Sequence, residues 1–219
     1  MAEGLRERKK RETRQRINRV AIELFVERGF DRVTIAEVAA AAEVSVNTLY
    51  NYFEAKEDLV LPPDQASSQR LADLVRDRAP GESAADAVLA RLRDEVGRRD
   101  RSLGLTEGFG RVFAMMRAAP TLIARLEDLG REMTDALAAV LAEETGAAPD
   151  DPLPRVVATQ LGAFHALVFA EIGRRTEAGE GPDAIAAAVN GLLDAFRRVL
   201  GEPLATYAVR GKGARACSG

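Results

Sequence analysis

The chain has 219 residues, of which 47% are hydrophobic and 30% charged, and its formal net charge is -3. Domains usually contain about 100–200 residues, so this length indicates one large domain or a small domain joined to a larger one. The apolar fraction is sufficient for a folded core, and an acidic total at first argues against a nucleic-acid partner.

Residue counts exclude several kinds of site. With one cysteine (Cys217) and one histidine (His165), neither a disulfide framework nor a Cys/His zinc cluster can be built. The sequence contains no Glu-x-x-His pair, no phosphate-binding glycine loop and no nucleophile–histidine pair, so we expect no enzyme, cofactor or metal site. The longest stretch without formal charge, 156–170, is shorter than the about 20 apolar residues of a membrane span, and the first residues lead into charge. We therefore expect a cytoplasmic protein without a membrane segment.

Helical periodicity extends along almost the whole chain, which predicts an all-α protein. Turn signals at Gly29-Phe30, Ala79-Pro80-Gly81 and 146–154 separate apolar stripes, and no stretch shows sustained period-two alternation. The first stripe recurs at i, i+3, i+4, i+7 and i+8 and consists of Ile17, Val20, Ala21, Leu24 and Phe25. Gly29 is placed for the left-handed residue of a Schellman ending, in which Phe30 packs on Phe25.

Two helix starts follow, only eleven residues apart. Thr34 and Glu37 form a capping box, and Ser45 is a second N-cap. Each start is flanked by a hydrophobic staple, Val33 with Val38 and Val44 with Leu49. Because isolated helices this short are marginal in water, we expect both to pack on the first helix as a helix-turn-helix unit.

The second short helix presents polar and aromatic side chains away from the core. Leu49 and Phe53 are four residues apart and are predicted to face inward, whereas the outward residues are Val46, Asn47, Thr48, Tyr50 and Tyr52. An asparagine can pair with adenine and a valine can contact a thymine methyl, while hydroxyls and lysines bind phosphates. The alternative is that the two tyrosines lie at the edge of the core and Asn47 is merely solvated.

These residues resemble the DNA-binding domain of TetR-family transcriptional regulators. The matching strings are Phe25-Val26-Glu27-Arg28-Gly29-Phe30, Thr34-Ile35-Ala36-Glu37-Val38-Ala39, Val44-Ser45 with Thr48-Leu49-Tyr50-Asn51-Tyr52-Phe53, and Lys56-Glu57-Asp58-Leu59. The resemblance covers roughly the first quarter of the chain. Two positions depart from it: Glu43 stands where the family often has glycine, and Ala55 where a capping residue is common.

The resemblance implies DNA contacts by side chains of the helix-turn-helix. The residues expected to face mainly phosphates are Thr34, Ser45, Thr48, Tyr50, Tyr52 and Lys56. Val46 and Asn47, with Tyr50 in part, are the candidates for base contact. A basic segment ahead of the first helix is expected to follow the DNA backbone or to enter a minor groove as an arm; it consists of Arg6, Arg8, Lys9, Lys10, Arg11 and Arg14. For any single arginine, a solvated helix start is the alternative.

The resemblance also implies a larger C-terminal domain that binds a small molecule and dimerises. We expect a DNA-binding domain at 1–54, a helical ligand-binding and dimerisation domain at 55–200, and a disordered tail at 201–219. Two long helices near the end suit a four-helix dimer interface or a folding core; their stripes are Val157, Leu161, Phe164, Val168 and Ile172, and Ile185, Val189, Leu192, Phe196 and Leu200.

Candidates for the ligand pocket are apolar side chains with two polar anchors. The apolar set is Phe109, Phe113, Met115, Met116 and Leu122, and the anchors are Arg117 and His165. The same spacing is typical of an ordinary core, and a lone histidine on an apolar helix is more often a core residue. No catalytic residue is expected.

Together these features predict a ligand-responsive transcriptional regulator. We expect a homodimeric repressor, paired through its last two long helices, that a small apolar effector releases from a near-palindromic double-stranded DNA operator. Ligand entry would shift the helix beginning near Lys56 and so change the separation of the two recognition helices. The alternative is a helical module that sequesters small molecules or binds proteins without a specific DNA target.

The distribution of charge agrees with the DNA-binding prediction. Residues 1–19 carry a net charge of +5, and the remaining 200 residues carry -8. The acidic total therefore averages a basic leading segment with an acidic body, which would repel DNA elsewhere.

Overall fold

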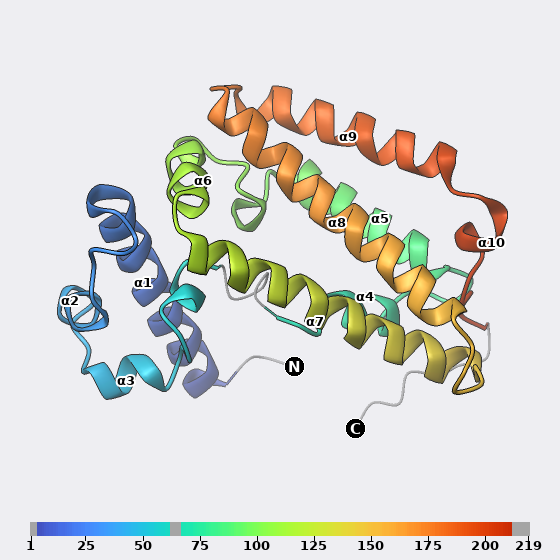
Figure 1. Cartoon of the computed structure of the whole chain (residues 1–219), viewed down its shortest axis with the longest axis horizontal. Helices are drawn as coiled ribbons and strands as arrows, with labels where there is room; N and C mark the ends of the chain where they lie inside the picture. Colours follow the sequence, from blue (N-terminus) through green and yellow to red (C-terminus); the bar gives the residue numbers. More distant parts are fainter. Residues whose placement is uncertain (1–3, 62–66, 212–219) are drawn as a thin grey trace. The chain divides into compact units, whose positions relative to one another are not determined.

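The structure, a computed structural model, describes residues 4–61 and 67–211, and within them every regular element is helical (Figure 1). Two compact units are present. The first comprises Met1–Ser67 and Gly110–Glu127, and the second comprises Ser68–Phe109 and Asp128–Gly219. This division differs from the predicted boundary after residue 54, because the segment 110–127 belongs with the first unit.

The first unit contains the predicted helix-turn-helix. Its elements are α1 (Leu5–Arg28), α2 (Ile35–Ala41), α3 (Val46–Tyr50), the 3-10 helix η1 (Glu57–Leu59), nearly all of α6 (Phe109–Arg117) and the first turns of α7 (Pro120–Thr145). Helix α1 contacts α2 and η1, and α2 contacts α3. The two short helices therefore pack on the first, as their marginal intrinsic stability requires.

The predicted helix starts are confirmed. The Glu37 amide donates to Thr34 Oγ1 (3.2 Å), and the Thr34 amide donates to a Glu37 carboxylate oxygen (2.8 Å), which is the complete capping box. The Ser45 hydroxyl accepts a hydrogen bond from the Thr48 amide (3.0 Å). Exposed amides at both N-termini are thus satisfied by side chains that directly precede or begin each helix.

The ending of α1 differs from the prediction. Gly29 has φ 90° and ψ 141°, and its amide donates to the Phe25 carbonyl. A Schellman ending needs ψ near the left-handed helical value, so that motif is wrong: the extended ψ leads the chain straight into the loop before α2. The predicted packing of Phe30 on Phe25 is confirmed, with ring centroids 4.9 Å apart in an edge-to-face contact.

The turn between α2 and α3 uses the left-handed backbone region without glycine. Glu43 has φ 54°, a value that costs a residue with a Cβ roughly 1–2 kcal/mol. The Val44 amide after it donates to the Ala39 carbonyl (2.9 Å), which closes the turn. Glutamate therefore takes the conformation that glycine would adopt more cheaply.

One hydrophobic core joins the helix-turn-helix to the α6–α7 junction. The largest fully buried side chains on the helix-turn-helix are Ile17, Phe25, Leu49, Phe53 and Leu59. Met115, Ala119 and Leu122 belong to the same cluster. The first unit is therefore larger than a three-helix domain.

The second unit is a helical bundle. It contains α4 (Arg70–Arg76), α5 (Ala84–Gly97), the 3-10 helix η2 (Arg101–Leu103), the remainder of α7, α8 (Leu153–Glu177), α9 (Pro182–Val199) and α10 (Glu202–Ala205). Helix α9 packs on α8 and α5, and α5 also contacts α4 and α10. The rings of Phe164 and Phe196 stack between α8 and α9 at a centroid distance of 3.7 Å.

Helix α8 is the one described helix that is long and apolar enough to cross a membrane by length and composition. Its predicted stripe is instead buried among the other helices of the unit: Val157, Leu161, Phe164, Val168 and Ile172. A Cβ at Gly162 would lie 2.5 Å from Thr134 Oγ1, so the Thr134 side chain on α7 would have to move if residue 162 carried one. Within the monomer, the stripe forms the folding core.

The predicted disordered tail is wrong for residues 201–211. Besides forming α10, this segment pairs with the start of α5: the Arg210 amide donates to the Glu82 carbonyl (2.9 Å), and the Gly81 amide donates to the Arg210 carbonyl (2.8 Å). Arg78 also donates to the Ala208 carbonyl (2.7 Å). Backbone hydrogen bonds thus order a segment with little apolar content. Residues 212–219, including Cys217, lie outside the described residues.

Candidate nucleic-acid interface

Helix α3 turns one face inward and leaves the other at the surface. Leu49 and Phe53 are buried, as predicted. On the opposite side, Val46 is 38% exposed, Tyr50 is 52% exposed, and Asn47 is also exposed. An amide, an aliphatic group and a phenol are therefore presented together from about one and a half helical turns.

The hydroxyl groups at the start of α3 lie beside these residues. Ser45 is exposed and Thr48 is half-buried, and their hydroxyl oxygens are 2.7 Å apart, within hydrogen-bonding distance. Tyr52 is half-buried and packs against the core of the first unit. The structure thus brings six of the predicted residues onto or next to one short helix.

Thr34 begins α2, and its hydroxyl is already engaged. Its Oγ1 donates to the Glu37 carboxylate (2.8 Å). Hydrogen bonds from the Thr34 backbone amide and then its hydroxyl lower the pKa of Glu37. Arg28 pairs with the same carboxylate at 3.6 Å. Thr34 is exposed at the surface, but its hydroxyl serves first as a structural cap.

Lys56 is directed into the protein. Its Nζ donates to the Phe30 carbonyl (2.6 Å) and lies 4.4 Å from the centroid of the Phe30 ring and 5.6 Å from that of Phe25. This cation–π and hydrogen-bonded position holds the loop before α2 against the segment after α3. The Lys56 ammonium therefore contacts Phe30 and is not part of the exposed group formed by Val46, Asn47 and Tyr50 on α3.

The helix predicted to begin near Lys56 is a single 3-10 turn. The Asp58 carboxylate accepts a hydrogen bond from the Ala55 amide (3.1 Å), and Ala55, one residue before the N-cap Lys56, has no hydroxyl to return one. The other Asp58 oxygen accepts from Arg125 Nε of α7 (3.0 Å). Asp58 therefore links this short turn to α7 through its ion pair with Arg125.

The basic segment is helical. Helix α1 begins at Leu5, so the expectation of an arm ahead of the first helix is wrong, and Arg6 to Arg14 lie on the first turns of that helix. The Arg14 guanidinium lies over the Phe53 ring at 5.3 Å, just beyond α3. Sequence reasoning also missed Asn18, which donates to the Leu59 carbonyl (2.7 Å), because no local spacing indicates a partner 41 residues away.

The predicted ligand residues do not belong to one unit. Phe113, Met116 and Arg117 lie in the first unit, whereas Phe109 and His165 lie in the second. Met116 packs against the core that contains Met115 and Leu122. Phe109 lies against Gly104, where a Cβ would come within 2.2 Å of its ring.

His165 is enclosed within the second unit. It is 9% exposed, and its Nε2 has no hydrogen-bond partner among the described residues. Burial, and then the positive charge of Arg70, lowers the pKa of His165 to about 4. Arg70 itself donates to both carboxylate oxygens of buried Glu95 (2.7 and 2.8 Å). A neutral imidazole thus lies near a buried ion pair.

A long first helix followed by two short ones, the second of them capped and facing outward, defines a helix-turn-helix DNA-binding fold. Residues 17–61 match the family model described as bacterial regulatory proteins, tetR family. The chain is 32% identical over 199 residues to the HTH-type transcriptional regulator TcmR of Streptomyces glaucescens, covering 89% of this chain and 87% of that protein. It is also 45% identical over 47 residues to the HTH-type transcriptional regulator LuxR of Vibrio harveyi, which covers 22% of this chain and 23% of that protein.

A solved structure of NalD from Pseudomonas aeruginosa, described as the secondary repressor of the MexAB-OprM multidrug efflux pump, has the same fold. Its TM-score is 0.53 at 20% identity, covering 87% of this chain and 98% of that chain. The chain belongs to the tetR family of bacterial regulatory proteins. It is a DNA-binding transcriptional regulator.

Proposed function

We propose that this regulator is a cytoplasmic homodimeric repressor that leaves a near-palindromic operator when a small apolar effector binds. The observation that carries the proposal is the exposed group Val46, Asn47 and Tyr50 on α3, held by the buried Leu49 behind it. A recognition helix uses its N-terminal residues on base edges in the major groove. Asn47 would pair with adenine, Val46 would contact a thymine methyl, and Ser45, Thr48, Tyr50 and Tyr52 would bind phosphates.

For Thr34 and Lys56, we propose different degrees of DNA contact. Thr34 is exposed at the start of α2 and would bind a phosphate while it caps the helix. Lys56 would act chiefly by positioning, since its ammonium holds the Phe30 carbonyl. The basic first turns of α1 add long-range attraction to DNA.

A surface on α8 supports dimerisation. Six exposed, uncharged residues recur along α8 at intervals of three, four, three, four and three: Leu153, Val156, Gln160, Ala163, Leu167 and Ala170. Leu153, Val156 and Leu167 are 52%, 46% and 49% exposed. This spacing presents one continuous stripe for helix–helix packing. On α9, Val199 is 78% exposed. We propose that two copies pair through these faces of α8 and α9.

For the effector, we propose a site in the second unit with His165 as a polar anchor and Phe109 as an apolar contact. The buried, unpartnered imidazole nitrogen is the support, since a ligand hydroxyl or amide could satisfy it. The other predicted contacts are Phe113, Met116 and Arg117, which belong to the first unit. We propose that they respond to the effector by a change in position at the α6–α7 junction. To change the ratio of the DNA-binding to the released conformation from 99:1 to 1:99, the effector must bind the released conformation more tightly by about 5.5 kcal/mol.

The test compares two asparagines on the same helix. A duplex selected from random DNA is titrated with the full chain, with Asn47→Ala and with Asn51→Ala, an exposed asparagine at the other end of α3. We expect Asn47→Ala to cost about 1–3 kcal/mol and to relax preference at particular base pairs. An equal loss across all sequences would make Asn47 a phosphate contact and contradict its proposed role.

The repressor mode is tested separately. Transcription from a promoter that carries the selected duplex should fall when the protein is added and recover when an effector is added. Increased transcription would instead make the protein an activator.

A further inference from the structure

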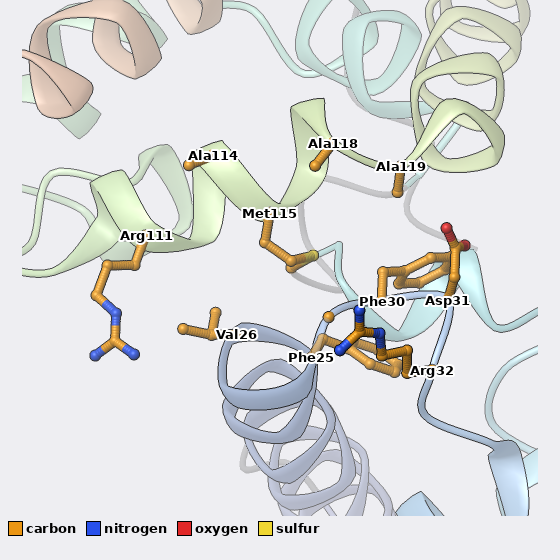
Figure 2. A pocket seen from close by; sticks show the side chains of 11 residues that line it. Phe25, Val26, Phe30, Asp31, Arg32, Arg111, Ala114, Met115, Ala118 and Ala119 are labelled. Carbon is orange, nitrogen blue, oxygen red and sulfur yellow. The ribbon is translucent and has the colours of Figure 1, made fainter.

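A cavity of about 450 Å³ lies within the first unit (Figure 2). One wall is the end of α1 and the loop that leads to α2, from Phe25 to Arg32, and the other is α6 with the residues after it, from Arg111 to Ala119. All these residues belong to the first unit, so the cavity is separate from the effector site proposed around His165.

The floor of the cavity is apolar. It is lined by Phe25, Val26, Phe30, Met115 and the small side chains of Ala114, Ala118 and Ala119. Figure 2 shows the Met115 side chain extending from α6 towards the rings of Phe25 and Phe30. Small-molecule sites in proteins typically have volumes of about 300–1,000 Å³, a mostly apolar lining and a few polar groups.

The rim carries two guanidinium groups. Arg32 comes from the loop before α2 and Arg111 from α6, and both are exposed. Neither has an ion pair with a carboxylate within the described ranges 4–61 and 67–211. The one acidic lining residue, Asp31, points its carboxylate away from both guanidinium groups in Figure 2. The charge available to an occupant is therefore positive.

We propose that this cavity binds a small organic anion with an apolar body, such as a hydrophobic carboxylate or sulfonate. The apolar part lies on Phe25, Phe30 and Met115, and the anionic group is held between Arg32 and Arg111. The ammonium of Lys56 lies beside Phe30, 4.4 Å from the ring centroid, and adds to the positive field.

An occupant of this cavity would join α6 to the helix-turn-helix. Arg32 is two residues before Thr34, the N-cap of α2, and Met115 belongs to the core shared with α1 and α3. Binding would therefore fix the loop that leads into α2 without requiring a ligand in the second unit.

The test uses two fluorescent probes of similar shape and different charge on the full chain. The anionic probe is 8-anilinonaphthalene-1-sulfonate, and the neutral probe is N-phenyl-1-naphthylamine. For the anion, the double variant Arg32→Gln/Arg111→Gln should weaken binding about tenfold or more, because charge-assisted hydrogen bonds are lost. Binding of the neutral probe should change less than about twofold in that variant.

A blocking variant and a charge control complete the experiment. Ala114→Leu fills the cavity from an exposed helical position, and it should weaken binding of both probes. Arg19→Gln/Arg198→Gln removes two exposed arginines that do not line the cavity and should leave both affinities unchanged. Anion binding that is unchanged in the Arg32/Arg111 and Ala114 variants would mean that the probe binds elsewhere, and would overturn the proposal. An equal loss in the Arg19/Arg198 control would also overturn it, since long-range charge alone would then explain the effect.

Discussion

The buried histidine makes a specific prediction about acid stability. His165 is the only histidine in the chain, and burial lowers its pKa to about 4, below the 6.5 of an exposed histidine. As the pH falls below 6.5, the unfolded chain therefore takes up a proton that the folded chain does not. The stability that depends on neutral His165 is present above pH 6.5 and is lost as the pH falls towards 4.

The size of this effect follows from the two pKa values. Each unit of difference in pKa corresponds to about 1.4 kcal/mol, so the loss between pH 7 and pH 5 is about 2 kcal/mol. The carboxyl groups with lowered pKa values, Glu37, Asp86 and Glu171, act in the same direction, but they begin to lose their contribution only as the pH approaches the ordinary values of 4.5 for glutamate and 3.8 for aspartate. Between pH 7 and pH 5.5 the histidine should therefore dominate the change.

Urea denaturation at several pH values measures this contribution. We expect the unfolding free energy of the wild-type chain to fall by about 2 kcal/mol more than that of His165→Gln between pH 7 and pH 5. The glutamine variant supplies a polar side chain that does not titrate. As a second measurement, the imidazole signal in an NMR titration should report a pKa near 4. Parallel pH profiles for the two proteins, or a native pKa near 6.5, would refute the reasoning.

Three further substitutions test the local structure by urea denaturation. Glu43→Gly should be about 1 kcal/mol more stable than Glu43→Ala, since only glycine takes the φ of 54° without strain, and equal stabilities would contradict this. Thr34→Ala should cost about 1 kcal/mol by removing the capping box, whereas Thr34→Ser should retain most of the stability; equal losses would exclude the hydroxyl as the cause. Arg70→Met should cost about 1–3 kcal/mol, because the two carboxylate oxygens of buried Glu95 lose their hydrogen bonds to Arg70 while the ion pair with Arg91 remains; Arg70→Met/Glu95→Leu should recover part of the loss, and no recovery would point to packing instead.

The parts of the fold that local chemistry determines were predictable from the sequence. Thr34 and Ser45 cap helices through contacts three residues away, so their spacing alone reveals them. Leu49 on α3 and Phe53 just after it are four residues apart and both buried, which leaves the opposite face of α3 as the exposed one. The candidate interface on α3 follows from these short-range relations.

The remaining features depend on contacts between distant segments. Lys56 looks like a phosphate ligand in sequence, but its ammonium bonds to a carbonyl 26 residues earlier. The stripe of Val157 and Leu161 is equally suited to a dimer interface and a core, and only packing on other helices assigns it to the core. Likewise, the tail around Arg210 is ordered by backbone pairing with Gly81 and Glu82, which composition cannot reveal.

Selection of bound duplexes from a random DNA pool tests the central claim most directly. A dimer with one exposed α3 in each copy should enrich an inverted repeat whose half-sites place the two helices about 34–36 Å apart in successive major grooves. Affinity for that sequence should fall steeply with increasing salt, because phosphate contacts release counterions. No enrichment at low salt, or an enriched site without two-fold symmetry, would contradict the account.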